Sequence, residues 1–431
     1  MQFAAAARPP DLAVQLTGRL RPGAGPGRAA TVRVADAADV LRTVRWAGRH
    51  GVPVGISGPG SPPAAGRRLL VDLGDLDAVT VSAAGWARVG AGTSWRRLQA
   101  AAARHGLAPV AGARPTERVA DSVTGGGVGP VARTYGLVSD RVRAVDLVTG
   151  DGVARSVTPV EHPELFWGVR GGGAALGVVT AVELDLLAAG PVWAGELRFG
   201  SEDAARVLQA WAGWSAALPA QAGTSLVLAR ARGGFPTVSV RFSWTGDPQA
   251  GAGVLEPLRG RARPVRDDVR ERPRASFSAI PGELGTGTES SLLLDRLPPE
   301  AVAPVVRAAH APGTRLVELR LLGGAVSWAP ELPSAVCHRD ARLAVRVAGD
   351  RGPGAEEATR AVAEELLAVV GPEAGGRAAA HGAGVVPDVL ARTPTRAVGD
   401  RLSALAAVAD PHGILDRSGL DRSGPPAGPP W

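Results

Sequence analysis

The sequence contains no lysine and no asparagine, so the 48 residues counted as Lys plus Arg are all arginine. Without lysine, Schiff-base catalysis, pyridoxal phosphate attachment and the phosphate-binding lysine of a P-loop are excluded, because each needs a primary amine. The single cysteine, Cys337, excludes an internal disulfide, a CxxC redox pair and a cysteine-rich zinc or iron–sulfur site. Other groups must therefore carry the chemistry.

Long apolar runs are also missing. None reaches the roughly 18 residues of a membrane helix, and the start, MQFAAAARPP, lacks the basic segment and apolar core of a secretion signal. We therefore expect a cytoplasmic protein with no membrane partner. The formal net charge is +7, but arginines alternate with acids along the whole chain, so no nucleic-acid partner is expected. No histidine pair has the i, i+4 spacing of a helical metal site, so no metal is expected.

The 431 residues are enough for two domains. In the first half, residues 31–57 predict a strand, a helix capped by Asp36 or Asp39 and ending at Gly51, and a second strand. A strand, a hairpin and a helix capped by Thr93 or Ser94 follow, then a segment at 112–129 dominated by loop chemistry, another hairpin and a strand. We expect this first domain to span residues 1–187.

After Gly190 the pattern changes to alternating strands, such as TVSVRFSW, TESSLLLDRL, RLVELRLL and ARLAVRVA, with helices at 201–217, 299–309 and 355–370. This predicts a second domain at 191–390 with a mostly antiparallel sheet backed by helices, so the fold class is α+β. Residues 391–415 form a C-terminal segment containing a last helix, and the Pro- and Gly-rich residues 416–431 are expected to be a disordered tail.

Three glycine-rich segments precede residue 187, at 58–66, 125–129 and 171–173. Glycine permits positive φ and close backbone approach, as diphosphate binding requires, but a Gly-rich protein also has Gly-rich turns. The order of these segments and of the residues around them is more specific. It is carried by four stretches, VPVGISGPG, ARVGAGTSWRRLQAAAARHGLAPVAGARPT, TGGGVGPVARTYGLVSDRVRAVDLVTGDG and HPELFWGVRGGGAALGVVTAVELDL. Together they resemble the flavin-binding domain of the p-cresol methylhydroxylase and vanillyl-alcohol oxidase superfamily, in particular the berberine bridge enzyme-like FAD-linked oxidases.

The resemblance implies an FAD domain of two subdomains, to which the C-terminal segment returns, and an α/β substrate domain over the isoalloxazine ring. It also implies which residues hold FAD, with the protein supplying placement and electrostatics. These are Ser57, Gly58, Pro59, Gly60 and Ser61 at the diphosphate, Pro115, Thr116, Thr124, Gly125, Gly126, Gly127 and Gly129 along the diphosphate and the ring, and Gly177, Val178, Val179 and Thr180 on the adenosine side.

Several positions depart from the family pattern. Ser61 and Arg114 stand where many members tether FAD through a histidine and a cysteine, so we expect noncovalent FAD. Cys337 lies in another segment and is interpreted as a small packed residue. Pro59, Arg118 and Asp121 replace glycines of the family, and a side chain at a close-approach glycine could block the ligand or shift the backbone.

The candidate catalytic residues are Glu318, His338 and Arg320. In RLVELRLLGG a period of two puts Leu316, Glu318 and Arg320 on one face, along a strand that resembles one lining the family's substrate pocket. Glu318 is the leading candidate base, and the alternative is a strand-surface salt bridge with Arg320, which could instead hold an anionic substrate. His338 could reach the same pocket. The family's C-terminal tyrosine cannot be transferred, because Tyr135 is the only tyrosine.

Two functional hypotheses follow. The first is an FAD-dependent oxidase that removes hydride from a small organic substrate and passes the electrons to dioxygen, with a dehydrogenase as a variant. The second is a degenerate member of the fold that binds flavin or a small molecule without turnover. Neither the substrate nor the oligomeric state follows from the sequence.

Overall fold

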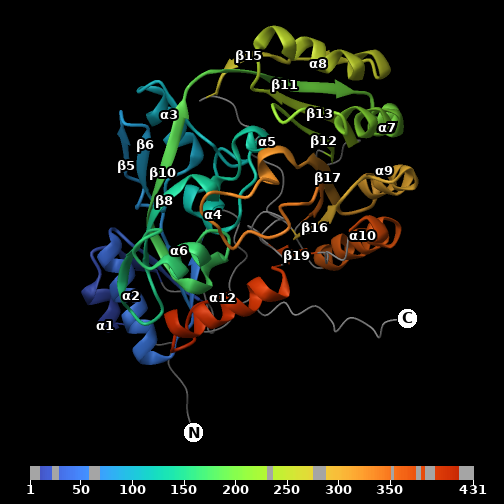
Figure 1. Ribbon diagram of the computed structural model, residues 1–431. Coiled ribbons are helices and arrows are strands. Elements are labelled where there is room, and N and C mark those ends of the chain that lie inside the picture. The colour runs from blue at the N-terminus through green and yellow to red at the C-terminus, as the bar shows by residue number, and fades with distance from the viewer. Residues whose placement is uncertain are drawn as a thin grey trace.

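The computed structural model describes residues 10–21, 29–57, 68–230, 236–274, 288–350, 354–374, 380–383 and 394–416 (Figure 1). The predictions for Gly58, Pro59, Gly60 and Ser61, and for the tail from residue 417 onward, lie outside these residues.

The N-terminal part is built on a strand–helix–strand unit, as predicted. Strand β2 (Ala30–Arg33) leads into α2 (Ala37–His50), whose first turn is capped by Asp36 and which ends at Gly51 with φ 58°. Strands β3 (Val54–Ser57) and β4 (Leu69–Asp72) pair in parallel, and β2 joins β4 in the same sense. The helix α1 (Pro10–Gln15) and the edge strand β1 (Arg19–Arg21) complete a sheet of order β1-β2-β4-β3.

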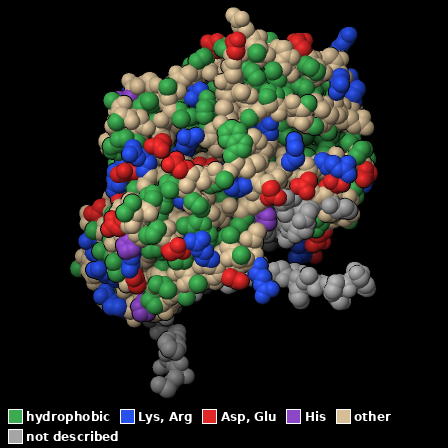
Figure 2. All heavy atoms as spheres, in the orientation of Figure 1, with side chains coloured by type: hydrophobic (Ala, Val, Ile, Leu, Met, Phe, Trp, Pro, Cys, Tyr) green, Lys and Arg blue, Asp and Glu red, His purple; other side chains and the backbone are tan. Residues whose placement is uncertain are grey.

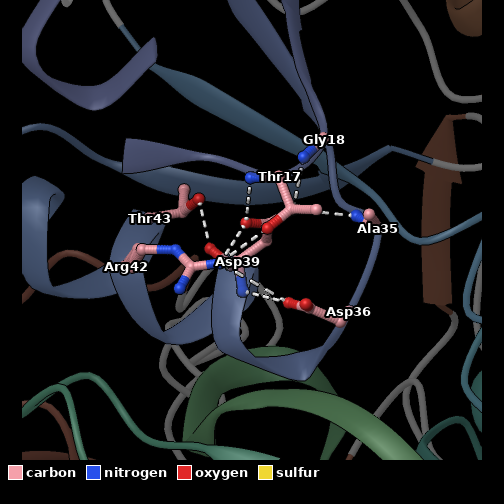
Figure 3. Close-up of polar contacts among 7 residues, drawn as sticks. All are labelled: Thr17, Gly18, Ala35, Asp36, Asp39, Arg42 and Thr43. Atoms are coloured by element: carbon pink, nitrogen blue, oxygen red, sulfur yellow. Dashed lines mark hydrogen bonds and ion pairs between the residues drawn. The ribbon is translucent and has the colours of Figure 1, made fainter. Parts of the chain in front are cut away.

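Asp39, in the first turn of α2, ties the entering chain to this unit (Figure 3). Its fully buried carboxylate accepts hydrogen bonds from the backbone N–H groups of Thr17 at 2.9 Å, Gly18 at 2.7 Å and Ala35 at 2.9 Å. Arg42 Nη2 donates to it at 2.7 Å. Burial alone would raise the pKa of Asp39, but these donors outweigh burial and lower it below its usual value. Asp36 thus caps the helix, whereas Asp39 binds the backbone of the segment that precedes it.

A second sheet packs on α2. Its described strands follow the order β5-β6-β10-β8-β9, with β7 also paired to β10, and every pairing is antiparallel. Apolar side chains of α2, the first sheet and this second sheet share one core. The bounds are β5 (Val79–Ser82), β6 (Trp86–Gly90), α3 (Trp95–Ala103, capped by Ser94), β7 (Leu107–Pro109), β8 (Val142–Val148), β9 (Ala154–Val157) and β10 (Val178–Ala188).

The segment at 112–129 is mostly loop, as expected, but it also contains a short helix that the sequence pattern did not predict. This helix is α4 (Val119–Thr124), whose Val119 and Val123 are fully buried in the first core. Six residues rich in Thr, Ser and Asp give little helical signal, and burial decides the conformation. Two further short helices flank the second sheet, α5 (Ala132–Tyr135) and α6 (Pro163–Val169).

The second half of the chain forms a large sheet that begins immediately after β10. Its described strands follow the order β14-β11-β13-β12-β17-β18-β16-β19, with β15 on β11, all antiparallel. The bounds are β11 (Pro191–Phe199), β12 (Ala222–Arg230), β13 (Pro236–Trp244), β14 (Arg266–Asp267), β15 (Arg270–Pro273), β16 (Thr288–Leu294), β17 (Thr314–Leu321), β18 (Leu343–Gly349) and β19 (Ala380–Ala383).

Four helices lie along the outer side of this sheet (Figure 1). They are α7 (Ala204–Ser215), α8 (Pro248–Arg261), α9 (Val302–His310) and α10 (Ala355–Val370). Alternate strand residues such as Val317, Leu319 and Val345 share a core with them. The sequence analysis missed α8, because Pro257 lies inside it and its glycines weaken the helical pattern. The inner face of the sheet is turned toward α4 and α5 (Figure 1).

The C-terminal helix α12 (Arg396–Ala409) returns to the first half of the chain. Its Leu402 and Ala406 pack on Trp167 of α6. Beyond it, Leu415 forms a parallel bridge to Val54, and Val54 N donates to Ile414 O at 2.7 Å. None of the described helices is long and apolar enough to cross a membrane. On the face shown in Figure 2, acidic and basic side chains are interspersed.

Candidate active site

A cavity lies where the first half of the chain meets the inner face of the large sheet. It encloses about 450 Å³, counting space open to solvent. One wall is the chain from the loop after α4 into α5, and the other is formed by β12, β13 and β17. The lining residues are Val128, Gly129, Pro130, Ala132, Arg133, Gly223, Thr224, Ser225, Arg241, Phe242, Ser243, Arg320, Leu321 and Val326.

The predicted face of β17 is confirmed. Val317 and Leu319 belong to the core under the helices, while Leu316, Glu318 and Arg320 lie on the opposite side. Arg320 Nη2 donates to Glu318 Oε1 at 3.1 Å, and its Nη1 donates to Val128 O at 2.8 Å. The salt bridge that the sequence offered as the alternative to a catalytic base is therefore present, but it is buried rather than on the strand surface, because the cavity wall covers this face.

Three arginines surround Glu318, which is 2% exposed. Besides Arg320, Arg241 Nη1 lies 4.0 Å from Glu318 Oε1 and Arg346 Nη1 lies 3.5 Å from Oε2. Burial alone would raise the pKa of the carboxyl group, but the three guanidinium groups outweigh burial and lower it to about 2. A carboxylate of that pKa is a weak proton acceptor near neutral pH. The role of Glu318 as a base stays a prediction, and the geometry favours a counter-ion.

The charged network continues away from the cavity to β16. Arg346 donates to both carboxylate oxygens of Glu289, which is fully buried. Arg114 Nη2 lies 3.6 Å from Glu289 Oε1. Arg114 stands at the position where the family resemblance placed a cysteine link to FAD. In this chain that position joins the first half to the large sheet through an ion pair.

His338 and Cys337 lie in the loop before β18. Among the described residues lining the cavity, His338 does not appear, so its catalytic role also stays a prediction. Its φ of 54° is unusual for a residue other than glycine. Cys337 is buried, and burial raises the pKa of its thiol. The interpretation of Cys337 as a small packed residue is confirmed.

Two of the departures from the family pattern compensate each other. Arg118 Nε donates to Asp121 Oδ2 at 2.8 Å, and Arg118 Nη1 donates to Ser57 O at 2.9 Å. Ser57 is the last described residue before the predicted diphosphate loop. The two residues that stand in place of the family's glycines therefore form one neutral ion pair, which links α4 to the end of β3.

The other predicted FAD residues lie in three places. Pro115 and Thr116 precede α4, with Pro115 O accepting from Arg96 N at 2.8 Å and Thr116 exposed. Thr124, Gly125, Gly126 and Gly127 end α4, where Gly126 has φ 69°. Val178 and Val179 start β10 and pair with β8, and Gly177 directly precedes them.

Gly129 is needed for packing as well as for any ligand. A Cβ built on it would lie 1.8 Å from Ala111 O, a distance that no side chain can adopt. Part of the glycine pattern therefore reflects close packing of the protein backbone on itself. This agrees with the alternative that the glycine-rich segments are turns of a glycine-rich protein. Their roles toward FAD remain predictions.

Three arginines of the site were not predicted from the sequence, and two of them, Arg241 and Arg133, are buried. Arg241 and Arg346 complete the network around Glu318. Arg133 crosses from α5 to the large sheet and donates to the carbonyl groups of Ala222, Leu218 and Leu322. Burial lowers the pKa of Arg133 to about 10, with Arg342 adding to the effect. The alternation in TVSVRFSW could have placed Arg241 on the face opposite Phe242, but no local signal places that face beside Glu318.

Comparison with known proteins agrees with this arrangement. Residues 28–158 match the family model described as an FAD binding domain. (R)-6-Hydroxynicotine oxidase of Paenarthrobacter nicotinovorans is 30% identical over 293 residues, which cover 65% of this chain and 62% of that protein. This chain therefore contains an FAD-binding domain at residues 28–158. The predicted resemblance and the FAD cofactor are confirmed.

Solved structures support the fold along nearly the whole chain. Physcomitrella patens BBE-like 1 has a TM-score of 0.78 at 18% identity and covers 95% of this chain and 98% of its own. The 6-hydroxy-D-nicotine oxidase structure from Arthrobacter nicotinovorans has a TM-score of 0.74 at 23% identity, covering 93% and 96%. The predicted α+β fold is confirmed. In sequence, the match spans 62% of the length of the curated nicotine oxidase and 34% of a Fusarium proliferatum FAD-dependent monooxygenase.

The residues at the end of the glycine run fit a flavin. Val128 and Gly129 form the cavity wall that directly follows this run, and Val128, Ala132 and Val326 give the cavity apolar surface beside the hydroxyl groups of Thr224 and Ser243. A flat apolar ring can pack on such a wall and leave the cavity to a substrate. The Arg118–Asp121 pair beside Ser57 is neutral, so it adds no net repulsion to a diphosphate.

Proposed function

We propose that this protein is an FAD-dependent oxidase of a small organic substrate that binds in the cavity between the FAD domain and the large sheet. The observation that carries the proposal is the position of that cavity, which opens directly against Val128 and Gly129 at the end of the glycine run. The relatives named as oxidases support the same class of reaction.

The overall reaction removes two hydrogens from the substrate, one as hydride from a C–H bond and one as a proton. Bound FAD supplies the hydride acceptor. Dioxygen takes up two electrons and two protons and leaves as hydrogen peroxide, so the substrate and dioxygen give the oxidised substrate and peroxide. We expect FAD to be held noncovalently, because Arg114 is engaged with Glu289 and Cys337 is buried elsewhere.

The residues of this chain have three roles in that reaction. Val128 and Gly129 border the ring side of the cavity, and Arg320 is fixed there by its bond to Val128 O. Ser243 Oγ donates to Pro130 O at 2.7 Å and so joins the sheet to the opposite wall of the cavity. Glu318 holds the arginines in place as their counter-ion.

The experiment is an absorption spectrum of the purified protein after FAD soaking and desalting, followed by acid precipitation and a peroxide assay with a substrate panel. Flavin bands near roughly 370 and 450 nm, all released into the acid supernatant, are expected. Yellow colour kept in the pellet would contradict noncovalent binding. A protein that takes up FAD but releases no peroxide with any substrate would favour the degenerate binding module instead.

A further inference from the structure

Two carboxylates, Glu289 and Glu318, are buried on the inner face of the large sheet, and Arg241 is the arginine of that face that is itself buried and lines the cavity. Glu318 has Arg241, Arg320 and Arg346 around it, so it is shared among three guanidinium groups. The other acid that acts on Arg241, Glu196, is paired with Arg198 at 2.9 Å. Arg241 therefore has only a distant share of one carboxylate, and a buried charge without a close partner is costly.

Arg241 presents its guanidinium to the cavity. Its side chain is 9% exposed, and it lines the cavity from β13. Its Nε is buried and has no hydrogen-bond partner within the described part of the chain. The carboxylate nearest to its guanidinium among the described residues is that of Glu318, at 4.0 Å, which is beyond hydrogen-bond distance.

We propose that Arg241 binds the carboxylate of an anionic substrate in this cavity. Arginine presents a planar set of N–H donors that matches the two oxygens of a carboxylate, and such charge-assisted pairs are the strong hydrogen bonds of proteins. Arg320 adds positive charge from β17 but is held by Val128 O and Glu318. Arg241 is thus the specificity-determining residue, and the inference rests on the proposed function in assuming that the bound molecule is a substrate.

The rest of the cavity fits the body of a small carboxylic acid. Val128, Ala132 and Val326 supply apolar surface on the FAD side, while Ser225 and Ser243 flank Arg241 on the sheet. A molecule whose carboxylate lies on Arg241 would direct its remaining carbon atoms toward Val128 and Gly129. A C–H bond close to the carboxylate then lies against the wall at Val128 and Gly129, which we assign to the flavin ring.

Binding measured separately from turnover tests the inference. Calorimetric titration of the FAD-loaded protein would compare acetate, benzoate and phenylacetate with acetamide, benzamide and phenylacetamide. We expect each carboxylate to bind about 10- to 100-fold more tightly than its amide, as one charge-assisted bidentate pair implies. Equal affinity for acids and amides would overturn the inference without touching the proposed oxidase function.

Variants locate the effect. Arg241→Met should remove most of the preference for carboxylates, and Arg241→Lys should keep part of it, because lysine keeps the charge but not the planar geometry. Arg307→Met on α9, an arginine that is 62% exposed on the helical side, is the matched control and should leave the preference unchanged. Arg241→Met that keeps the full preference would overturn the assignment to this residue, and the wild-type comparison above stands even if that variant fails to fold.

Two other results would also contradict the inference. Inorganic phosphate that competes as well as benzoate would indicate a general anion site. Arg241→Met that weakens FAD binding without changing the preference would show that Arg241 contacts the flavin. Conversely, a protein that binds carboxylates through Arg241 but takes up no FAD would overturn the oxidase proposal, and Arg241 would then bind an anionic ligand that is not a substrate.

Discussion

Replacing Glu318 by glutamine separates a general base from a counter-ion. The substitution keeps the shape of the side chain and removes its charge, leaving Arg241, Arg320 and Arg346 with one neighbouring carboxylate fewer. The pKa of Glu318 is lowered from 4.5 to about 2 by these arginines. At about 1.4 kcal/mol per pKa unit, the ionised carboxylate stabilises the folded state by about 3 kcal/mol, an order-of-magnitude figure.

The sign of the pH dependence follows from the lowered pKa. The contribution of Glu318 is fully present above the unfolded-state pKa, near 4.5, and is lost as pH falls toward the folded-state pKa of about 2. We therefore expect Glu318→Gln to lower the free energy of unfolding by about 3 kcal/mol at neutral pH. The difference between the two proteins should shrink to less than half by about pH 3.

Urea unfolding followed by tryptophan fluorescence, at several pH values, measures this difference. Glu365→Gln is the control, because Glu365 pairs with Arg307 on the surface, where both side chains are more than half exposed, and such pairs contribute less than about 1 kcal/mol. The counter-ion role is refuted if Glu318→Gln is as stable as the wild type at neutral pH while peroxide release collapses. Retained turnover with the expected loss of stability would rule out Glu318 as the base.

Three further predictions concern other parts of the molecule. Asp39→Asn should lower the free energy of unfolding by about 1–3 kcal/mol and speed proteolysis near Thr17, because an amide offers one oxygen acceptor where the carboxylate offers two to the same N–H donors. An unchanged cleavage pattern would contradict the role of Asp39 in holding this segment. Asp121→Ala should destabilise the wild-type protein more than it destabilises Arg118→Ala, because in the wild type it leaves Arg118 buried without its carboxylate. A double-mutant cycle in thermal unfolding measures this difference, and additive effects of the two substitutions would argue against the ion pair. Cys337 should resist thiol reagents at pH 8 until urea unfolds the protein, because burial raises its pKa; rapid labelling of native protein would contradict this.

Much of the fold follows from local patterns in the sequence. The cap at Asp36 and the positive φ at Gly51 delimit α2 where the pattern predicted. The change from β10 to β11 falls at residues 188–191, where the pattern of strands also changes. The helix α4 was missed because six residues are too few for a helical period to stand out from the surrounding loop, and the core around Val119 and Val123 fixes their conformation.

The site was only half accessible to the same reasoning. Period two placed Glu318 and Arg320 on one face, because that depends on a single strand. The partners that decide what Glu318 does come from β13 and β18, and β13 and β17 meet only through β12 between them. Strand order is a tertiary property, so the sequence left Glu318 open between a base and a surface salt bridge with Arg320. The structure has a buried carboxylate among three arginines, with a lowered pKa.

Because the chain has no lysine, the positive charges around Glu318 are all carried by arginine. Buried lysine can lose its proton near neutral pH, and a surplus of positive charge then disappears by titration. Arginine offers no such route. Even Arg133, bonded to carbonyl groups alone, keeps a pKa of about 10 in this structure and is charged at neutral pH. Arg241 is for the same reason a fixed positive charge beside the cavity, and among the described residues no carboxylate lies within hydrogen-bond distance of it. An anion that enters the cavity is the species that can pair with it directly.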